Sequence, residues 1–553
     1  MSGELDVPFL IVGAGPVGLT AARLLANAGR RCIVVERRDG PQRNPAAHVV
    51  NARTLEILHQ AGFDMAAIAR LAKDPADAGH VNFVTRLNGQ LIGRLPFERQ
   101  GEECLAHTPF PLRNISQHRL EPLMSAEVAA LPEVDLRYST EWVSGTQTDD
   151  GVVSIIRDLA TGEETVVRSS MLFGADGAGS AVRKWLGIEM IGPARIQSFV
   201  AIHFRANLRE YIADRLGVLH FVMDPEVAGT FIAHDIDGEW VFMLGFDPDK
   251  ETADDYDAER SARIVRAAIG DDRADIEIVG AGTWHMTAQV AERMRSGRVF
   301  LLGDAAHRFP PTGGMGLNTG VADAHNLIWK VLAVEEGWGD LGGGDLGQGG
   351  SLLDSYESER RPVAELNCHQ SLTNAFKMVI LAQALELHPA ATSADLTATL
   401  SDPTRLESIA AAVQEQATHF DMLGLQLGYV YGSPDSTADP SVFAPTGAVG
   451  SRLPHALLAH AHSTLDLVDP RSMTLLTFGS HDGWNAVAGS QGTPLAHVVL
   501  EGEAAVDPRW STICQLGPTG AVLVRPDQHI AWRAAEFSDD AAAALRATLT
   551  HLA

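Results

Sequence analysis

Three closely spaced glycines, Gly13, Gly15 and Gly18, constrain how the start of this chain can fold. They follow an apolar run at residues 7–12, precede a segment with apolar residues at helical spacing, and are followed by Glu36 at the end of the next apolar run. This order predicts a strand, a tight turn, a helix and a second strand, which together form the dinucleotide-binding Rossmann unit. Gly13 would make the turn, Gly15 would admit a pyrophosphate and Gly18 would let the helix pack on the strand. Glu36 would accept hydrogen bonds from ribose hydroxyls.

The composition is that of a globular protein with a strongly acidic charge. The chain has 553 residues, of which 45% are hydrophobic, so it is long enough for two or three cores and for burying a large cofactor. The formal net charge of -27 argues against binding nucleic acid or an acidic membrane through bulk electrostatics, and it leaves room for a local basic pocket. We therefore expect neither nucleic acid nor a membrane as a partner.

The cysteines indicate a reducing environment. Cys32, Cys104, Cys368 and Cys514 are widely separated, without the CxxC or Cys/His spacing of zinc sites or disulfide frameworks. We expect no metal site and a cytoplasmic location. The first residues carry acidic side chains and lack the cleavage site of a secretion signal. Elsewhere the sequence shows no run of roughly 20 apolar residues, the length that spans a bilayer.

Alternation of polar and apolar residues predicts strands in the middle of the chain. It indicates an antiparallel ribbon at residues 136–167 and several strands within 198–246. The second group would form a sheet that walls a substrate site, and its aromatic residues suit either an aromatic substrate or a plain core. The glycine-rich stretch at 337–350 predicts a flexible loop.

Two later segments favour FAD over NAD as the ligand of the Rossmann unit. They read GADGAGSAVR at residues 174–183 and GDAAHRFPPTGGMGLN at 303–318. Together with the first glycine motif, they stand in the order of the single-component FAD aromatic hydroxylases typified by para-hydroxybenzoate hydroxylase, which the chain resembles over residues 7–370. The final block resembles the thioredoxin-like domain of phenol, dichlorophenol and polyketide hydroxylases. It lacks a CxxC motif, so its expected role is packing or a dimer contact.

The resemblance implies an α/β fold: a Rossmann-like FAD-binding domain with an interleaved α+β substrate domain, plus a C-terminal thioredoxin-like domain. We expect the FAD-binding domain at residues 1–370, with the substrate-binding sheet interleaved at about 76–120 and 190–290. A helical connection is expected at 371–440 and the thioredoxin-like domain at 441–553. A homodimer is compatible with this organisation.

The resemblance also implies which residues hold FAD. Asp304 would bind the ribityl chain, and the bare backbone after it would lie against the isoalloxazine ring, where a side chain would obstruct the approach. The helix that follows would direct the positive end of its dipole at the charge that develops on the reduced flavin. The full cofactor set is Gly13, Gly15, Gly18, Glu36, Arg37, Arg43, Arg53, Gln117, Asp176, Gly177, Arg183, Gly303, Asp304, Gly313, Gly314, Met315, Gly316, Leu317 and Asn318.

Several of these assignments have an alternative. Asp176 and Gly177 would serve both the FAD pyrophosphate and NADPH, with Arg183 as a nearby cation for phosphate. Arg183 is alternatively an ordinary surface charge. Arg43 and Arg53 flank the place of a flavin-phosphate arginine, and only one of them need be functional, because either could be a solvated charge.

As a member of this class the chain would be a monooxygenase. NADPH or NADH would bind transiently and reduce FAD, dioxygen would add at flavin C4a, and one oxygen atom would pass to a phenolic or polycyclic aromatic ring. One alternative keeps the fold but inserts oxygen beside a polyketide-like ketone, as a Baeyer-Villiger enzyme does. The other alternative is a flavin-binding protein without turnover.

The catalytic candidates rest on their position alone. Pro310 and Pro311 would stiffen the segment near the flavin carbon that takes up oxygen. A base that activates the phenol would have a pKa near neutrality. His220, His234 and Asp235 lie on the predicted substrate sheet, and a histidine satisfied inside a strand is the competing interpretation.

Overall fold

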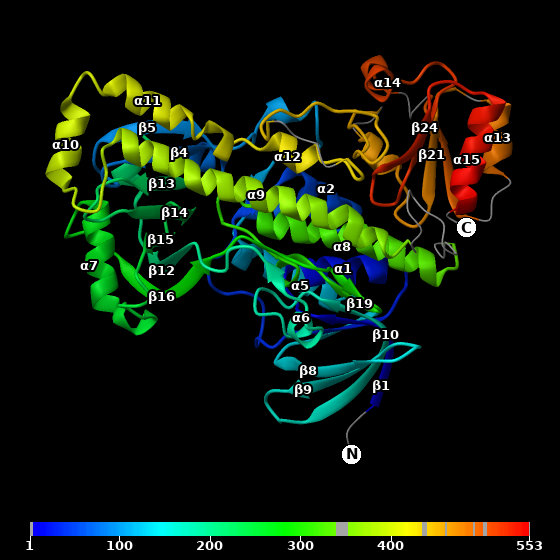
Figure 1. Ribbon diagram of the computed structural model, residues 1–553, viewed down its shortest axis with the longest axis horizontal. Coiled ribbons are helices and arrows are strands. Elements are labelled where there is room, and N and C mark those ends of the chain that lie inside the picture. Colours follow the sequence, from blue (N-terminus) through cyan, green and yellow to red (C-terminus); the bar gives the residue numbers. More distant parts are fainter. Residues whose placement is uncertain are drawn as a thin grey trace.

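The computed structural model describes residues 4–338, 352–433, 439–458, 462–479, 481–489, 493–501 and 506–551. Most of the glycine-rich stretch predicted as a flexible loop at 337–350 lies outside these residues. Figure 1 shows a central Rossmann-like body, a second sheet at its left, and a smaller C-terminal unit at its upper right.

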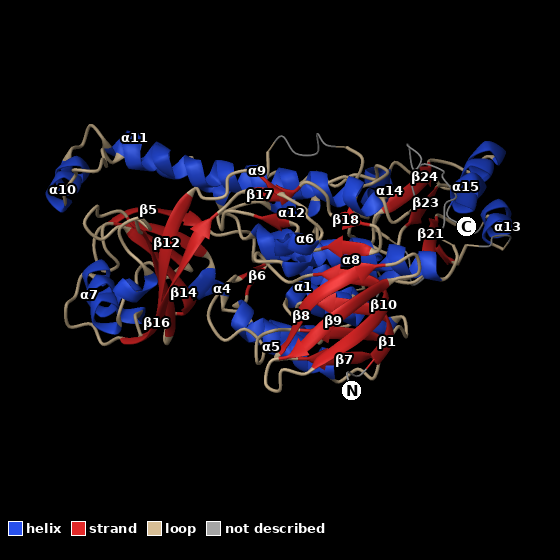
Figure 2. Cartoon of the chain, turned by 60° about the horizontal axis from the view of Figure 1, so that its bottom comes forward, coloured by secondary structure: helices blue, strands red, loops and turns tan. Residues whose placement is uncertain are grey.

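The central sheet contains the predicted strand, helix and strand. Its strands lie in the order β18 (Arg295–Ser296), β19 (Val299–Leu301), β10 (Glu164–Gly174), β1 (Glu4–Val12), β2 (Cys32–Val35) and β7 (Val134–Arg137). The five from β19 to β7 are parallel, and β8 (Thr140–Gln147) and β9 (Val152–Asp158) extend β10 as the predicted antiparallel ribbon (Figure 2). Phe9, Leu10 and Ile11 of β1 are fully buried, as a strand covered on both faces requires.

Two helices lie together against this sheet. Helix α1 (Pro16–Asn27) connects β1 to β2, and α8 (Met315–Glu335) packs on it. The right-handed connection from strand through helix to parallel strand places the N-terminus of α1 at the carboxyl end of β1. Because α8 follows β19 in the same sheet, its N-terminus comes to the same side. The two glycine-rich turns therefore meet although about 300 residues separate them.

The second sheet is built from two distant parts of the chain. Its order is β16 (Glu277–Met286), β12 (Gln197–Arg205), β15 (Glu239–Gly245), β14 (Gly229–Asp235), β13 (Leu219–Val222), β4 (His80–Val84) and β5 (Leu91–Pro96). Strand β4 pairs in parallel with β13, which interleaves this sheet with the FAD-binding domain. Phe231 and Phe242, expected to suit either a substrate or a core, are fully buried in a cluster with Phe204 and Trp240. That cluster is core.

A long helix connects the parts. Helix α9 (Ser355–Ala384) packs on α8 and then extends across to the second sheet, where α11 (Leu406–Gln414) lies on β5 (Figure 1). Helices α10 (Ser393–Ser401) and α12 (Leu423–Leu427) complete this region. The expected start of the helical connection at residue 371 falls inside α9, so the helix belongs to both parts.

The C-terminal unit has a mixed four-stranded sheet. Its order is β22 (Leu495–Val499), β21 (Met473–Thr477), β23 (Ala521–Val524) and β24 (Ile530–Ala534). Strand β21 is parallel to β22 and antiparallel to β23. Helix α13 (Asp482–Ala488) lies between β21 and β22, α14 (Pro508–Cys514) lies between β22 and β23, and α15 (Asp539–His551) follows the β23–β24 pair, an order compatible with the expected thioredoxin-like domain. Cys514 is fully buried, and burial raises its thiol pKa to about 12.

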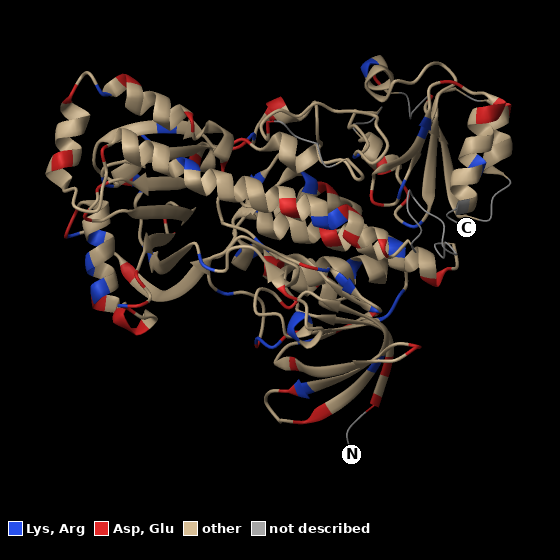
Figure 3. Cartoon of the chain, in the orientation of Figure 1, with Lys and Arg blue, Asp and Glu red and all other residues tan. Residues whose placement is uncertain are grey.

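Buried charges join this unit to the FAD-binding domain. Glu359 on α9 accepts hydrogen bonds from Lys330 Nζ on α8 at 2.7 Å and from both terminal nitrogens of Arg525 at 2.6 and 2.9 Å. Burial opposes ionisation of this carboxyl, yet Arg525 and Lys330 lower its pKa to about 2. Figure 3 shows acidic and basic residues interspersed along α9, and Glu359 is one whose charge is almost fully enclosed.

Replacing Glu359 with alanine should lower the free energy of unfolding by about 3–5 kcal/mol, because Lys330 would remain buried without its ion-pair partner and Arg525 would keep only Asp527. Urea unfolding of the FAD-bound protein measures the loss. The matched control is Glu365→Ala on the same helix, whose partner Arg361 lies 3.2 Å away in a half-exposed pair. It should cost less than about 1 kcal/mol. Equal losses in the two variants would contradict the structural role of Glu359.

Candidate active site

The first glycine turn leaves space at the start of α1. Gly13 has φ +108°, and a Cβ there would lie 2.2 Å from the carbonyl oxygen of Ala175. A Cβ at Gly18 would lie 2.0 Å from the carbonyl oxygen of Gly13. Gly15, the N-cap of α1, has no atom within 4 Å of the corresponding position. Gly13 and Gly18 are thus required sterically, and the open space at Gly15 fits a phosphate approaching the helix N-terminus.

The side chain of Glu36 is held by Arg38, two positions later in the sequence. Its Oε2 accepts from the backbone N–H of Ala14 at 3.0 Å, and its Oε1 accepts from Nε of Arg38 at 3.1 Å. Burial opposes ionisation, yet the hydrogen bonds from Arg38 and Ala14 lower the pKa of Glu36, so it faces the nucleotide space as a carboxylate. Arg37, expected to bind the cofactor, is exposed. Sequence alone could not choose between two adjacent arginines, and the structure assigns the position beside Glu36 to Arg38.

Gln117 belongs to the same cluster through a carboxylate that the motifs did not reveal. Glu121, on helix α5 (Gln117–Ala129), is fully buried. It accepts from Nε2 of Gln117 at 2.9 Å, from Arg38 at 2.9 Å and from the backbone N–H of Gln42 at 2.8 Å. Gln117 is therefore linked to Glu36 through Glu121 and Arg38, and its contact with FAD stays a prediction.

The two candidate flavin-phosphate arginines lie in different surroundings. The side chain of Arg43 is 73% exposed and pairs with Asp39 at 3.1 Å. Arg53, on helix α2 (Ala52–Gln60), is buried and donates to Gln528 Oε1 at 2.6 Å and to the carbonyl oxygen of Asp527 at 2.8 Å. We reassign Arg53 to the contact with the C-terminal unit, because both of its terminal nitrogens are engaged there.

The motif at residues 174–183 forms a helix cap. Asp176 accepts from Ser180 Oγ at 2.6 Å and from the backbone N–H of Ala181 and Val182 at the start of α6 (Ala181–Trp185). Arg183 is 4% exposed and donates to the carbonyl oxygen of Ala305 at 2.9 Å. The surface alternative for Arg183 is therefore wrong, because its guanidinium connects this turn to the loop that carries Asp304. Gly177 has φ +76° with open space around it.

The loop at residues 303–318 presents an unpaired carboxylate. Within the described residues, no hydrogen bond reaches the carboxylate of Asp304. Surrounding protein raises its pKa, against the opposing charges of His307 and Arg308, yet its surface stays accessible. Gly314, with φ +63°, caps α8 without a side chain, so the first N–H groups of the helix stay available to a ligand. An accessible carboxylate beside bare helix N–H groups fits the ribityl chain and ring of FAD.

The remaining members of this loop pack around it. Met315 is buried, while Gly316 lies open beside Asp304, at 3.8 Å from its Oδ1 in the Cβ position. Asn318 uses its side chain inside the protein: it accepts from the N–H of Asn51 at 2.9 Å and donates to the carbonyl oxygen of Val49 at 3.0 Å. Asn318 therefore fixes the loop, and only its backbone remains for the cofactor. Gly303 and Gly313 precede α8 and Leu317 lies in its first turn, and their contacts with FAD stay predictions.

Asp323 on α8 positions the loop and was missed from the sequence. Its fully buried carboxylate accepts from the N–H of Gly303 at 3.1 Å, from His307 Nε2 at 2.7 Å and from Arg360 Nε at 2.8 Å. Burial opposes ionisation, yet His307 and Arg360 lower its pKa. The available signal was a single acid within the apolar run of α8.

The catalytic candidates differ in burial and in hydrogen-bond partners. His220 is fully buried, contacts the carbonyl oxygen of Gly217 at 3.2 Å, and burial lowers its pKa to about 4, so it is a core histidine. Asp235 has a half-exposed side chain 3.5 Å from Arg119, beyond the enclosed part of the sheet. His234 is nearly buried and shares a 2.6 Å hydrogen bond with Ser116 Oγ. Pro310 is buried and Pro311 is exposed.

His48 lies beside His234 and was not a candidate. The two rings make an edge contact with centroids 5.9 Å apart, and Phe97 lies 6.2 Å from His48. The next residue, Val49, reaches the flavin loop, since a Cβ at Gly314 would lie 2.7 Å from its Cβ. Nδ1 of His48 contacts Asn114 Oδ1 at 3.0 Å, while Nε2 has no partner among the described side chains and backbone. His48 thus stands between the loop and the second sheet with a free ring nitrogen.

Comparison with known proteins gives the family. Residues 6–371 match the family described as FAD binding domain, and residues 446–553 match the one described as aromatic-ring hydroxylase, C-terminal. The chain belongs to the FAD-dependent aromatic-ring hydroxylases.

Named relatives of the hydroxylase are monooxygenases. It is 35% identical to 4-methyl-5-nitrocatechol 5-monooxygenase of Burkholderia sp, over 98% of this chain and 96% of the relative. It is 32% identical to 2,4-dichlorophenol 6-monooxygenase of Cupriavidus pinatubonensis, over 98% and 95%. Among solved structures, the flavin-dependent monooxygenase PieE in complex with FAD and substrate is 31% identical, with a TM-score of 0.90 and full coverage of both chains. The expectations of FAD and of a monooxygenase are confirmed, and these relatives support neither the ketone-oxidising nor the non-catalytic alternative.

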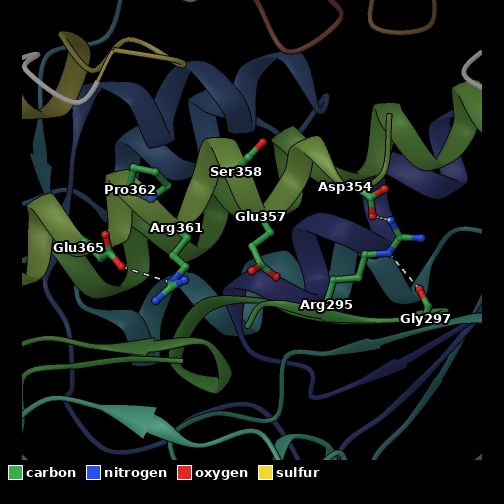
Figure 4. A pocket seen from close by; sticks show the side chains of 8 residues that line it. All are labelled: Arg295, Gly297, Asp354, Glu357, Ser358, Arg361, Pro362 and Glu365. Carbon is green, nitrogen blue, oxygen red and sulfur yellow. Dashed lines mark hydrogen bonds and ion pairs between the residues drawn. The ribbon is translucent and has the colours of Figure 1, made fainter. Parts of the chain in front are cut away.

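A surface hollow of about 610 Å³ lies away from the flavin loop, between the β18–β19 turn and the start of α9 (Figure 4). Its lining alternates in charge, with Arg361 paired to Glu365 at 3.2 Å and Arg295 paired to Asp354. This mixture selects no ligand, so we do not count the hollow as part of the hydroxylase site. None of the described helices is both long and apolar enough to cross a membrane.

Replacing Asp304 with alanine should weaken FAD binding about 10- to 100-fold, because a hydrogen bond to a charged group contributes about 1.5–3 kcal/mol. Titration of the apoprotein with FAD, followed by flavin fluorescence, measures the dissociation constant. Asp237→Ala is the control, since Asp237 pairs with Arg209 at the surface of the second sheet. An Asp304→Ala protein that binds FAD as tightly as the parent would remove Asp304 from the cofactor site.

Proposed function

We propose that the hydroxylase adds one oxygen atom to a phenol, either a small substituted ring or a polycyclic one, with NADPH or NADH as the electron donor. Relatives named for nitrocatechol and dichlorophenol support the first class. A relative named tetracenomycin A2 monooxygenase-dioxygenase, from Streptomyces glaucescens and 32% identical, and a solved complex of aklavinone-11 hydroxylase with FAD and aklavinone support the second.

The observation that carries the phenol assignment is the free Nε2 of His48. Burial, with the charge of Lys73, lowers the pKa of His48 to about 3, so the ring is neutral before substrate binds and Nε2 holds a lone pair. A phenol hydroxyl placed between the flavin loop and the sheet would donate to this atom. As the hydroxyl proton shifts toward Nε2, electron density at the ring carbons would rise, and the developing phenolate charge would raise the pKa of His48 from its low value in the absence of substrate.

Lys73 would stabilise the resulting charge. Its Nζ donates to the carbonyl oxygen of Ala233 beside His234. Burial, followed by the nearby charge of Arg119, lowers its pKa to about 7, so it carries a partial positive charge at neutral pH. A phenolate formed beside His48 would be attracted both by the new imidazolium and by Lys73.

Bound FAD would supply the oxygen-activating chemistry. The chain would hold it with the N-terminus of α1, Glu36, Asp304 and the first turn of α8. The residues around His48 would orient the phenol, and Phe97 together with the packed sheet would keep water away from the reacting carbon.

The reaction is tested with the purified FAD-loaded protein in air. NADPH and NADH consumption are followed with 4-nitrocatechol, 2,4-dichlorophenol and a hydroxylated anthraquinone. The molecular masses of the products are measured by mass spectrometry. A phenol-stimulated rate with a gain of one oxygen atom is expected. If none of the phenols gains oxygen while a cyclic ketone yields a lactone, the phenol assignment is wrong.

Replacing His48 with alanine should lower kcat about 100-fold, because the proton acceptor is lost while the cofactor residues stay in place. FAD content should match that of the parent, and KM for NADPH should not change. His285→Asn is the matched control on the second sheet, since His285 is exposed and bonds Ser198 Oγ at 2.9 Å. Parental kcat in the His48→Ala protein would exclude His48 as the base.

A further inference from the structure

The role proposed for His48 requires one particular tautomer. Only a ring protonated at Nδ1 has its lone pair on Nε2, where the phenol would lie. Resting on that proposed function, we infer that the side-chain amides of Gln100 and Asn114 form a directed pair that fixes His48 in this tautomer. The two amides are positioning residues, since neither is placed against substrate or cofactor.

The hydrogen bonds of Gln100 fix which way its side-chain amide points. Its Nε2 donates to the carbonyl oxygens of Ala78 at 3.1 Å and Phe97 at 2.8 Å. Both partners only accept, so the nitrogen end of the amide must face them and the oxygen end must face the other way. Gln100 is 6% exposed, so water is not at hand to offset a reversed amide.

The orientation of the Gln100 amide in turn fixes that of the Asn114 amide. Its Nδ2 donates to Gln100 Oε1 at 3.1 Å, which leaves Oδ1 toward His48 Nδ1 at 3.0 Å. An amide oxygen only accepts, so Nδ1 must carry a proton and Nε2 must carry the lone pair. Asn114, on β6 (Arg113–Asn114), is fully buried, and a flipped side chain would place its Oδ1 against Gln100 Oε1, acceptor to acceptor.

The arrangement predicts how many protons accompany phenolate binding. If the phenol is already ionised in solution, its oxygen meets a lone pair on Nε2, and His48 must take up a proton to form a hydrogen bond. A ring free to change tautomer would instead move its own proton from Nδ1 to Nε2 and would need none. The number of protons taken up on binding therefore identifies the tautomer of His48, and the measurement does not require turnover.

Other titratable groups lie near His48 and can also exchange protons when a ligand binds. Lys73 lies near it from the segment after α3 (Met65–Leu71), and His234 faces it from β14. His118 and Glu239 lie behind His234. All four remain when Asn114 is changed, so the difference in uptake between parent and variant isolates the ring of His48.

The test uses the oxidised FAD-loaded protein and 4-nitrophenol above its solution pKa, by calorimetry in buffers of different ionisation enthalpy. Asn114→Leu keeps the shape but removes the acceptor, and Asn114→Asp keeps an acceptor. Uptake should fall by about one proton in Asn114→Leu relative to the parent and recover in Asn114→Asp. With a substrate found as above, kcat should fall about tenfold in Asn114→Leu and recover in Asn114→Asp.

The outcomes separate the two proposals. Equal proton uptake by the parent and Asn114→Leu overturns the directed pair even if His48→Ala is slow. Failure of the parent to bind any phenol, or full activity of His48→Ala, overturns the proposed function and the pair with it. Should Asn114→Leu not retain FAD, Gln100→Leu gives the second test, because it frees Asn114 to rotate. Its uptake should also fall below that of the parent, and parental uptake there counts against the pair.

Discussion

The buried carboxylate of Asp323 is the interaction on which the cofactor site depends. From α8 it joins the backbone of Gly303 and the ring of His307, both in the flavin loop, to the guanidinium of Arg360 on α9. A charge enclosed in this way is stable only when every partner is in place, so the three groups have one arrangement relative to each other. Asp304 follows Gly303 directly, and its accessible carboxylate is aimed by a neighbour that never meets the ligand.

The sequence predicted best where the requirement is local. Gly13 and Gly18 were identified because a tight turn and a close helix leave no space for a Cβ, and that rule needs only the neighbouring residues. The contact between Arg53 and Gln528 could not be predicted, because the two residues are 475 positions apart and a charge pattern does not reveal a distant partner. His48 stands in no motif, and its importance appears only when β6 and β14 are brought beside it. The strands of the second sheet were predictable by alternation, whereas the parallel pairing of β4 with β13 was not.

Enclosed ion pairs also set the orientation of the C-terminal unit. Arg452 donates to Glu56 at 2.8 Å, and Glu56 also pairs with Arg53, while Glu359 holds Lys330 and Arg525 nearby. Such pairs add little net stability, because desolvation offsets most of the attraction. They do penalise any other arrangement of the two surfaces, since a shift would leave several charges unpaired at once. The contact therefore defines one orientation more than it adds stability.

Helix α9 has a mechanical consequence. Its 30 residues extend about 45 Å. About 33 Å of this separates Glu359, with its ion pairs, from Leu381, which packs in the apolar cluster under β4 and β5. The second sheet and the C-terminal unit therefore contact opposite ends of one helix, although Pro362 removes one backbone hydrogen bond from it. The C-terminal unit holds one end of α9 through Arg525, and the second sheet packs on the other end at Leu381, so a displacement of this helix would disturb both contacts.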